Sequence, residues 1–327
     1  MEASTTPLPP VGGSLSGVVH VDDPSFARLI DPAAPLVRLV DGCIWAEGPV
    51  WIPGEEALLF SDIPNDRAMR WTAARGAEVA RQPNDFTNGN TLDREGRVVH
   101  CEHGPRRVTR DDGAGGREVL ADRHAMGKLN SPNDVVVRSD GTIWFTDPPY
   151  GILSDREGYA APSEQEGCFV FRLDPADGSL VPVVTSMGHP NGLAFSPDES
   201  ILYVADTLAA IVEPSAPRHI LAFDVIDGRR LGPGRVFTTI DPGVPDGFRV
   251  DRDGNVWTSA HDGIQVYAPD GRRLGSIRVP EITANCVWGG TDGRRLFITA
   301  SSSLWAIETT TIGAGVAAAV ARGEHVR

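Results

Sequence analysis

The 327-residue sequence lacks several features that mark common classes of protein. Residues 1–19 contain no basic start and no long apolar segment, so we predict no secretory signal peptide. No uninterrupted apolar run approaches the roughly 20 residues that a membrane-spanning helix requires. The four cysteines are widely scattered and show no paired metal-ligand spacing, which favours free thiols in a reducing compartment. We therefore expect a cytoplasmic protein.

Positive charge is also scarce in this chain. The 30 Lys and Arg residues are outnumbered by 44 Asp and Glu residues, which gives a formal net charge of -14 at pH 7. Nucleic acids and anionic membranes attract proteins with excess positive charge, so we expect neither as a partner. The sequence also contains no phosphate-binding loop, no G-x-S-x-G elbow and no H-E-x-x-H motif. These absences argue against nucleotide-binding, serine-hydrolase and zinc-protease functions.

Turn-forming residues, in contrast, are abundant. The 36 glycines and 26 prolines make a mainly helical chain improbable and favour many short strands. Six segments share one pattern, in which a polar residue is followed by a short apolar run, a turn and a second apolar run. A glycine lies eight positions after the polar residue in four of the six, and such a turn between alternating runs predicts a β-hairpin. We call the six polar residues the anchors: Glu47, Asn88, Asn133, Asn191, Asp246 and Asn285.

The spacing of the anchors predicts a β-propeller. Successive anchors lie 41, 45, 58, 55 and 39 residues apart, and a repeat near forty residues with four short strands is typical of a propeller blade. The sixth repeat ends after its third strand, so we predict that residues 36–40 supply the fourth and close the ring. The predicted fold is all-β, a six-bladed β-propeller with four-stranded antiparallel blades. It comprises an N-terminal extension (1–34), one propeller domain (35–308) and a C-terminal tail (309–327).

Propeller topology brings the polar positions of the repeats to one mouth of the central channel. Each anchor opens the innermost strand of a blade, so all six should converge. Because a hairpin returns to where it began, the residues that end the second strands should stand at the same mouth. These residues are Asp62, His103, Asp147, Asp206, His261 and Ser302. The two long spacings arise from insertions at 148–166 and 207–218, which should overhang this mouth.

The chemistry of the anchors favours a hard cation. Carboxylate and amide oxygens are ligands for Ca²⁺, Mg²⁺ or Mn²⁺, and a wide ring of them favours calcium. A single Asn-Gly or Asp-Gly is explained by turn formation alone. Six polar residues in one register favour a shared site, although the pattern does not determine which of them bind the ion.

Four motifs resemble the SMP-30/gluconolactonase family: WAEGPVW (45–51), LNSPND (129–134), HPNGLAF (189–195) and PDG (245–247). The resemblance extends from the first anchor to Trp305. It implies a six-bladed propeller, a divalent cation at the channel mouth and hydrolysis of lactones. By the same resemblance, Glu47, Asn133, Asn191 and Asp246 correspond to the metal ligands. The implied ion is calcium, with Mg²⁺, Mn²⁺, Fe²⁺ and Zn²⁺ left open.

The resemblance implies a metal-dependent lactonase, most simply one acting on a sugar lactone such as gluconolactone. The cation would polarise the carbonyl, water would attack, and Asp246 is the first candidate for the general base, assisted by Asn191 and Asn133. The expected partner is this small-molecule lactone, and the protein should be a monomer or a small homo-oligomer. Two alternatives stay open: an organophosphate or phosphotriester hydrolase, and a non-catalytic calcium-binding propeller.

Four further residues are candidates for contact with the substrate. Asn88 corresponds, by the resemblance, to a polar residue beside the metal. His103 ends a predicted second strand, Tyr150 lies in the first insertion, and Arg106 follows the second strand of the second repeat. Each has an ordinary structural explanation as well: a neutral histidine, loop packing for the tyrosine and surface solvation for the arginine.

Overall fold

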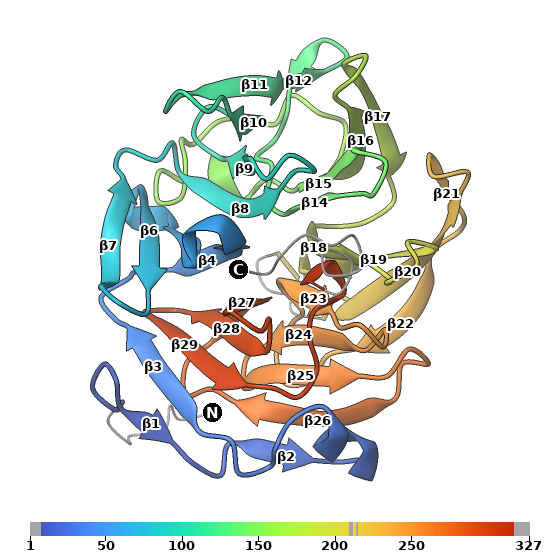
Figure 1. The fold of residues 1–327 in the computed structure, drawn as a ribbon. Coiled ribbons are helices and arrows are strands. Elements are labelled where there is room, and N and C mark those ends of the chain that lie inside the picture. Colours follow the sequence, from blue (N-terminus) through green and yellow to red (C-terminus); the bar gives the residue numbers. More distant parts are fainter. Residues whose placement is uncertain (1–7, 209–211, 214, 317–327) are drawn as a thin grey trace.

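The computed structural model describes residues 8–208, 212–213 and 215–316. In this part of the chain, six antiparallel sheets are arranged like blades around a central axis (Figure 1). The innermost strands β4, β8, β14, β18, β23 and β27 contact one another in that order, and β27 returns to β4. The predicted six-bladed β-propeller is confirmed.

Each blade runs from its innermost strand outwards, as the following bounds show. The first contains β4 (Ala46–Ile52), β5 (Ala57–Asp62), β6 (Arg67–Thr72) and β7 (Gly76–Arg81), and the second β8 (Thr87–Leu92), β9 (Val98–Glu102), β10 (Arg107–Asp111) and β11 (Arg117–Ala121). The third contains β14 (Val135–Val137), β15 (Ile143–Asp147), β16 (Phe169–Asp174) and β17 (Ser179–Val184), and the fourth β18 (Pro190–Phe195), β19 (Ile201–Asp206), β20 (His219–Ile226) and β22 (Arg235–Thr239). The fifth contains β23 (Phe248–Val250), β24 (Val256–Ala260), β25 (Gly263–Tyr267) and β26 (Arg273–Arg278), and the sixth β27 (Thr283–Gly289), β28 (Arg295–Ala300), β29 (Ser303–Glu308) and β3 (Leu36–Val40).

The remaining elements are short. Strand β21 (Arg230–Leu231) pairs with β20, and β12 (Arg123–His124) forms a hairpin with β13 (Gly127–Lys128). The described residues also form four 3₁₀ turns: η1 (Pro24–Arg28), η2 (Pro53–Glu55), η3 (Ile63–Asn65) and η4 (Tyr150–Ile152). No helix among the described residues has the length and apolar character needed to cross a lipid bilayer.

The ring is closed by the N-terminal strand that the sequence predicts. Strand β3 pairs antiparallel with β29, with Arg38 opposite Trp305, so a blue strand lies beside a red one in Figure 1. Two strands that the sequence did not predict extend this arrangement. Strand β1 (Ser14–Leu15) adds to the outer edge of β3, and β2 (Val19–Val21) adds to β26. The residues before the propeller thus cover the edges of two blades, which would otherwise expose unpaired backbone groups.

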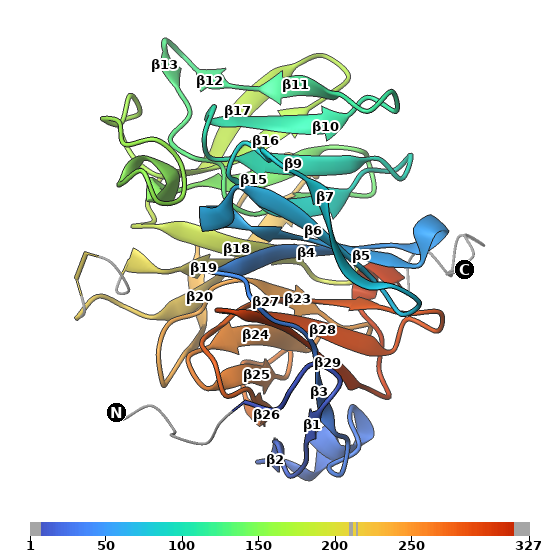
Figure 2. The same ribbon diagram turned by 90° about the vertical axis from the view of Figure 1, so that its left-hand side faces the viewer.

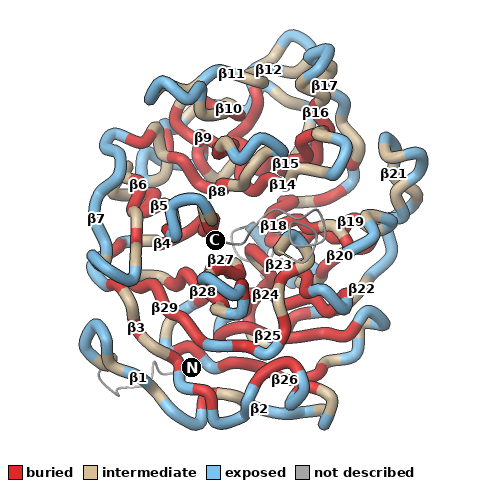
Figure 3. Tube along the Cα trace, viewed as in Figure 1, coloured by how far each residue is buried: buried red, intermediate tan, exposed pale blue. Residues whose placement is uncertain are grey.

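The core lies between adjacent blades. Because both faces of a blade pack against neighbours, its middle strands are buried without alternation, and all of β15 is buried. Trp144, Trp257 and Trp305 are fully buried in these layers, as their positions in the strand pattern predict. Burial is concentrated on the inner and middle strands, whereas the outer strand β7 and many of the turns are exposed (Figure 3).

The loops that follow second strands project on one side of the propeller, on the left in Figure 2. The segment between β15 and β16, which carries η4, corresponds to the first predicted insertion. The second insertion includes residues 209–211 and 214, which lie outside the described residues. The hairpin turns between first and second strands lie at the opposite end, because each first strand runs from the anchor to the turn.

Candidate functional site

The six anchors share a local distortion at the start of the innermost strands. In β4, β8, β18 and β27 the pairing with the second strand slips at the anchor, which is the mark of a β-bulge. In the other two blades, β14 and β23 begin two residues after Asn133 and Asp246. A bulge redirects a side chain out of the regular pleat. The distortion therefore directs the anchor side chains away from the regular pleat of the sheet.

Glycines directly after the anchors let neighbouring blades approach closely. A Cβ on Gly48 would lie 1.9 Å from the carbonyl oxygen of Asn88, and a Cβ on Gly247 would lie 2.0 Å from the side chain of Asn285. Gly89 and Gly192 approach the backbone of the next anchor in the same way. Between the last blade and the first, Asn285 Nδ2 donates to Glu47 Oε2 at 3.1 Å. The anchors of successive blades are thus neighbours around the axis.

Two anchor carboxylates lie in a poorly solvated environment. Glu47 is buried, and its Oε2 accepts hydrogen bonds from Asn285 and from the Gly48 amide. Burial raises the pKa of Glu47 to about 7, and the negative charge of Asp134 acts in the same direction. Burial also raises the pKa of Asp246 well above its ordinary value, and the charges of Glu47 and Asp134 add to this effect. Both pKa shifts indicate negative charge that lacks sufficient compensation.

A cation would supply that compensation, and the residues present fit one. Glu47, Asn133 and Asn191 are buried, Asp246 is partly exposed, and together they offer carboxylate and amide oxygens. Such oxygens suit Ca²⁺, Mg²⁺ or Mn²⁺ better than softer metals. Among the described residues, no three His, Cys, Asp or Glu side chains gather into a metal-ligating group. Half of the proposed ligand set consists of asparagine, so a site of this kind depends on amide oxygens.

A buried ion pair lies one step further along the innermost strands. Asp134, next to Asn133, is almost fully buried, and its Oδ2 lies 3.5 Å from Arg249 Nη1. The Asp134 carboxylate also accepts a hydrogen bond from the amide of Val135 at 2.9 Å. Arg249 is the positive group that counteracts the raised pKa of both Glu47 and Asp134. The sequence pattern gave no indication of this pair, since the two residues belong to different blades.

Three aspartates at the ends of second strands hold the loops that lead into the anchors. Asp62 Oδ1 accepts from the amides of Ile44 and Trp45 at 2.9 and 3.2 Å. The carboxylate of Asp206 binds the amides of Gly188 and His189 at 3.0 and 3.1 Å, and Asp147 Oδ2 binds the Asn130 amide at 2.8 Å. Their predicted position beside the anchors is confirmed, and their contacts are those of turn-capping groups.

His103 is a buried neutral imidazole beside Asn88. Its Nδ1 lies 3.0 Å from the carbonyl oxygen of Glu157, which can only accept, so the ring proton is on Nδ1. Nε2 is then an acceptor, and it lies 3.5 Å from Asn88 Nδ2. Burial lowers the pKa of His103 to about 4. The ring is therefore uncharged near neutral pH and presents a lone pair toward Asn88. His261, by contrast, is exposed.

Arg106 is buried and Tyr150 is half-buried with a buried hydroxyl, and the two side chains differ in their hydrogen bonds. No described residue makes a full hydrogen bond to the Tyr150 hydroxyl, although Thr207 and Asn191 are near enough to affect its pKa, which burial and the charge of Asp246 raise. Arg106 Nε donates to the carbonyls of Leu129 and Asn130 at 2.6 and 3.1 Å, and its Nη1 donates to Glu164 at 3.0 Å. Among the three guanidinium nitrogens of Arg106, Nη2 alone has no hydrogen-bond partner in the described part of the chain.

Comparison with known proteins places the chain in a family. Residues 45–302 match the family described as SMP-30/Gluconolactonase/LRE-like region. The chain belongs to this family. A gluconolactonase of Zymomonas mobilis is 31% identical, over 93% of this chain and 89% of that protein. Pentonolactonase XacC of Haloferax volcanii is also 31% identical, over 81% of this chain and 84% of that protein.

Solved structures of family relatives have the same architecture. The gluconolactonase XC5397 from Xanthomonas campestris is 38% identical, with a TM-score of 0.83, and the match covers 92% of this chain and 99% of that one. The calcium-binding protein regucalcin from Agrobacterium tumefaciens is 18% identical, with a TM-score of 0.68 over 84% of this chain and 94% of that one, and shares the fold. The family resemblance of the four motifs is thereby confirmed.

Sequence reasoning missed residues that act through their neighbours. Asn285 was recognised as an anchor, but its donation to Glu47 depends on the approach of the sixth blade to the first. Asn90 is buried two positions after Asn88, and Glu157 offers its carbonyl to His103 from the first insertion. A polar residue at alternate positions of a strand, as in Asn88-Gly-Asn90, was the available signal for Asn90.

Proposed function

We propose that this protein is a lactonase that hydrolyses the ester bond of a sugar lactone. The observation that carries the proposal is the pair of poorly compensated carboxylates, Glu47 and Asp246, beside the amide side chains of Asn133 and Asn191. The family relatives named gluconolactonase and pentonolactonase support a sugar lactone as the substrate.

Four residues would hold a divalent cation: Glu47, Asn133, Asn191 and Asp246. Calcium is the first choice, because the ligand set consists of oxygens and a calcium-binding protein has the same fold. Mg²⁺, Mn²⁺, Fe²⁺ and Zn²⁺ are the alternatives to be compared. When bound, the cation supplies the Lewis acidity that polarises the lactone carbonyl.

Asp246 is the proposed general base. Its backbone amide donates to Ser259 Oγ at 3.0 Å, which fixes the start of β23. A ligating carboxylate with a free oxygen can accept a proton, so Asp246 would take a proton from the attacking water. The water oxygen bonds to the carbonyl carbon, the ring C–O bond breaks, and the ring oxygen leaves with a proton as the hydroxyl of an open-chain acid. Asn191 and Asn133 orient the reacting groups.

The sugar hydroxyls would be bound by Asn88, His103, Tyr150 and Arg106. His103 Nε2 is an acceptor, and the Asn88 amide offers both functions. The Tyr150 hydroxyl and Arg106 Nη2 are donors that make no full hydrogen bond within the described part of the chain. This mixture matches hydroxyl groups, which both donate and accept. It would discriminate a polyhydroxylated lactone from an unsubstituted one, because a buried polar group that loses its partner costs free energy.

Lactone hydrolysis with and without chelator tests the proposal. We expect the wild-type protein to open D-glucono-1,5-lactone and a pentonolactone faster than γ-butyrolactone, with the activity lost after chelation. Asp246→Asn should abolish turnover and retain the circular-dichroism spectrum, whereas Glu118→Gln, which removes an exposed carboxylate, should be fully active. Near-normal hydrolysis by Asp246→Asn would overturn the role of Asp246. Hydrolysis of a phosphotriester but no lactone would favour the other hydrolase, and cation binding without either activity would favour the non-catalytic propeller.

We further propose a cytoplasmic protein with one propeller domain, acting as a monomer or small homo-oligomer. Its four cysteines are free, which suits a reducing compartment. Fractionation of the source cells and light scattering of the purified protein test these two statements.

A further inference from the structure

The side chain of Asn90 connects the first two blades beside the candidate site. Asn90 lies on β8 and is buried. Its Nδ2 donates to the carbonyl of Gly48 at 2.8 Å and to the carbonyl of Asn88 at 3.0 Å. Gly48 directly follows Glu47, and Asn88 is the anchor of the next blade. One carboxamide therefore links the backbone at two anchors, with Ser61 Oγ 3.1 Å away.

The two carbonyls determine the orientation of this amide. Carbonyl oxygens only accept, so Nδ2 of Asn90 must face them and Oδ1 must point away. Oδ1 lies 2.7 Å from His100 Nδ1, so this nitrogen must carry a proton and donate it. His100 lies on β9, two residues before Glu102.

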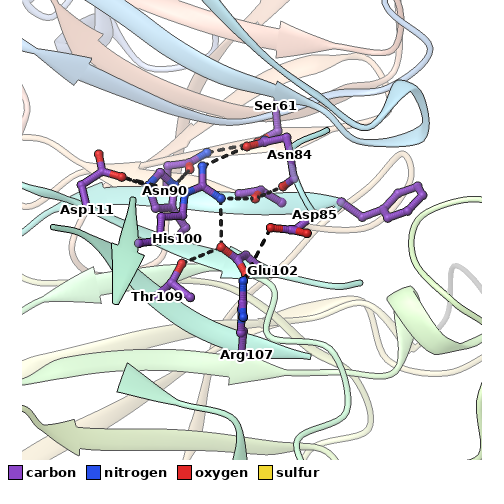
Figure 4. A network of polar contacts seen from close by, with 12 residues as sticks. Ser61, Asn84, Asp85, Asn90, His100, Glu102, Arg107, Thr109 and Asp111 are labelled. Carbon is purple, nitrogen blue, oxygen red and sulfur yellow. Dashed lines mark hydrogen bonds and ion pairs between the residues drawn. The ribbon is translucent and has the colours of Figure 1, made fainter. Parts of the chain in front are cut away.

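The opposite side of the His100 ring faces a carboxylate. His100 Nε2 lies 3.0 Å from Oδ1 of Asp111, at the end of β10 (Figure 4). The positive charge of Arg117 and the negative charge of Glu102 also act on the ring, and Arg81 acts on Asp111. Burial lowers the pKa of His100, whereas Asp111 opposes this effect. Both ring nitrogens of His100 thus face oxygen atoms, that of Asn90 on one side and that of Asp111 on the other, and the bond to Asn90 requires a proton on Nδ1 in the neutral and in the charged ring.

The close approach of Gly48 to the Asn88 carbonyl makes the linkage consequential for the site. Gly48 has a φ of 54°, and a Cβ placed there would lie 1.9 Å from the Asn88 carbonyl oxygen and 2.9 Å from Asn90 Nδ2. Without Asn90 Nδ2, the Gly48 carbonyl would lose this side-chain donor, whereas the Asn88 carbonyl would keep Ser61 Oγ at 2.8 Å. The loss would free the backbone at Gly48 to move, and Glu47 with it.

We propose that Asn90 is a positioning residue for the candidate site, and that the Nδ1–H group of His100 holds its carboxamide in the working orientation. The inference rests on the proposed function for its effect on catalysis. It adds to the anchors a supporting chain that runs from Asp111 through His100 and Asn90 to the backbone beside Glu47 and Asn88. Asn90 and His100 touch no reacting atom in this assignment.

A pair of substitutions at position 100 tests the hydrogen bond directly. His100→Gln retains an N–H donor, and His100→Met has similar bulk but no donor. We expect His100→Met to weaken Ca²⁺ binding, measured by calorimetry, by about tenfold or more, as is usual for residues that orient metal ligands. His100→Gln should remain within about threefold of the wild-type affinity, because it rescues the donor. The ratio kcat/KM for the lactone should follow the same order at saturating Ca²⁺.

Thr109→Val is the matched structural control. Thr109 is buried on β10, and its hydroxyl donates to Glu102 at 2.7 Å, with no hydrogen bond of its own to His100 or Asn90 among the described contacts (Figure 4). It should lower the melting temperature without changing Ca²⁺ affinity. Equal losses of affinity in Thr109→Val and His100→Met, or no rescue by His100→Gln, would overturn the proposal.

The protonation of His100 provides a measurement that is independent of turnover. In ¹⁵N NMR spectra, with the signal assigned by its loss in His100→Gln, Nδ1 should carry a proton throughout the titration and only Nε2 should titrate. A neutral ring protonated on Nε2 alone would overturn the proposed orientation. If the wild-type protein hydrolyses no lactone but the NMR and calorimetry results are as expected, the proposed function fails and the positioning role stands.

Discussion

Replacement of Glu47 by Gln should stabilise the protein in the absence of divalent cations, although Glu47 is a proposed ligand. Burial raises the pKa of this carboxyl from 4.5 to about 7 in the folded chain. The folded state therefore keeps the proton over a pH range in which the unfolded state has lost it. Stability falls as the pH rises through this window, so the carboxyl costs nothing below pH 4.5 and imposes its full penalty above pH 7.

The size of the penalty follows from the shift. At about 1.4 kcal/mol for each pH unit, it amounts to about 3 kcal/mol above pH 7. The neutral Gln accepts weaker hydrogen bonds from Asn285 and Gly48, which offsets about 1 kcal/mol. A net gain of about 2 kcal/mol corresponds to a rise in melting temperature of roughly 3 °C for a chain of this size.

Thermal unfolding at pH 8 and at pH 4.5, with chelator and with Ca²⁺, measures this effect. In chelator, Glu47→Gln should melt above the wild type at pH 8, and the difference should vanish at pH 4.5. With Ca²⁺ at about 100 times its dissociation constant, the wild type should gain about 2.7 kcal/mol and the variant little. Glu55→Gln, at an exposed carboxylate in the same blade, is the control. A lower melting temperature for Glu47→Gln in chelator at pH 8, or an equal response of both proteins to Ca²⁺, would refute the reasoning.

Three further predictions concern the surroundings of the site and the ring closure. Arg249→Met removes the positive side chain paired with Asp134. Calorimetry should therefore show about tenfold tighter binding of a divalent ion and a larger gain in affinity for a trivalent lanthanide. Weaker binding of the divalent ion would contradict this prediction. Tyr150→Phe removes a buried hydroxyl without a full hydrogen bond, so kcat/KM should fall about tenfold in steady-state kinetics while the melting temperature holds or rises; unchanged kinetics would remove Tyr150 from the substrate contacts. Phe26 is fully buried, and its ring centroid lies 5.9 Å from that of Trp257. Phe26→Ala should therefore lower the free energy of unfolding, measured with denaturant, by about 3–5 kcal/mol. Wild-type stability of the variant would show that this N-terminal segment is dispensable.

The fold was predictable from sequence because its information is local and repeated. Each blade is specified by an anchor, two apolar runs and a turn such as Gly96 or Gly141, both of which have positive φ values that favour glycine. The closing strand at residues 36–40 was predictable because the sixth repeat lacked a partner for its third strand. Strands β1 and β2 were not predictable, since two or three residues carry no measurable periodicity.

The common location of the anchors was predictable from the sequence, but the contacts of their side chains were not. The common register of the anchors placed them at one end of the ring, and the close contacts between successive anchors agree with that prediction. Three kinds of contact are visible only in the tertiary structure. Asp62 and Asp206 cap the loops before the anchors, Arg106 donates to loop carbonyls, and Asn285 donates to Glu47. Which of the anchors bind a cation stays a prediction for the experiments above.

The sequence by itself determined the number of blades, the strand that closes the ring and the set of polar residues at one end. It could do so because hairpins form between neighbouring segments, and their turn residues and apolar runs are written in order along the chain. The tertiary structure alone decided which side chains meet across blades, such as Arg249 with Asp134 and Asn90 with Gly48. Those contacts depend on the packing of segments that are tens of residues apart in the sequence. No local sequence pattern indicates which of these segments pack together.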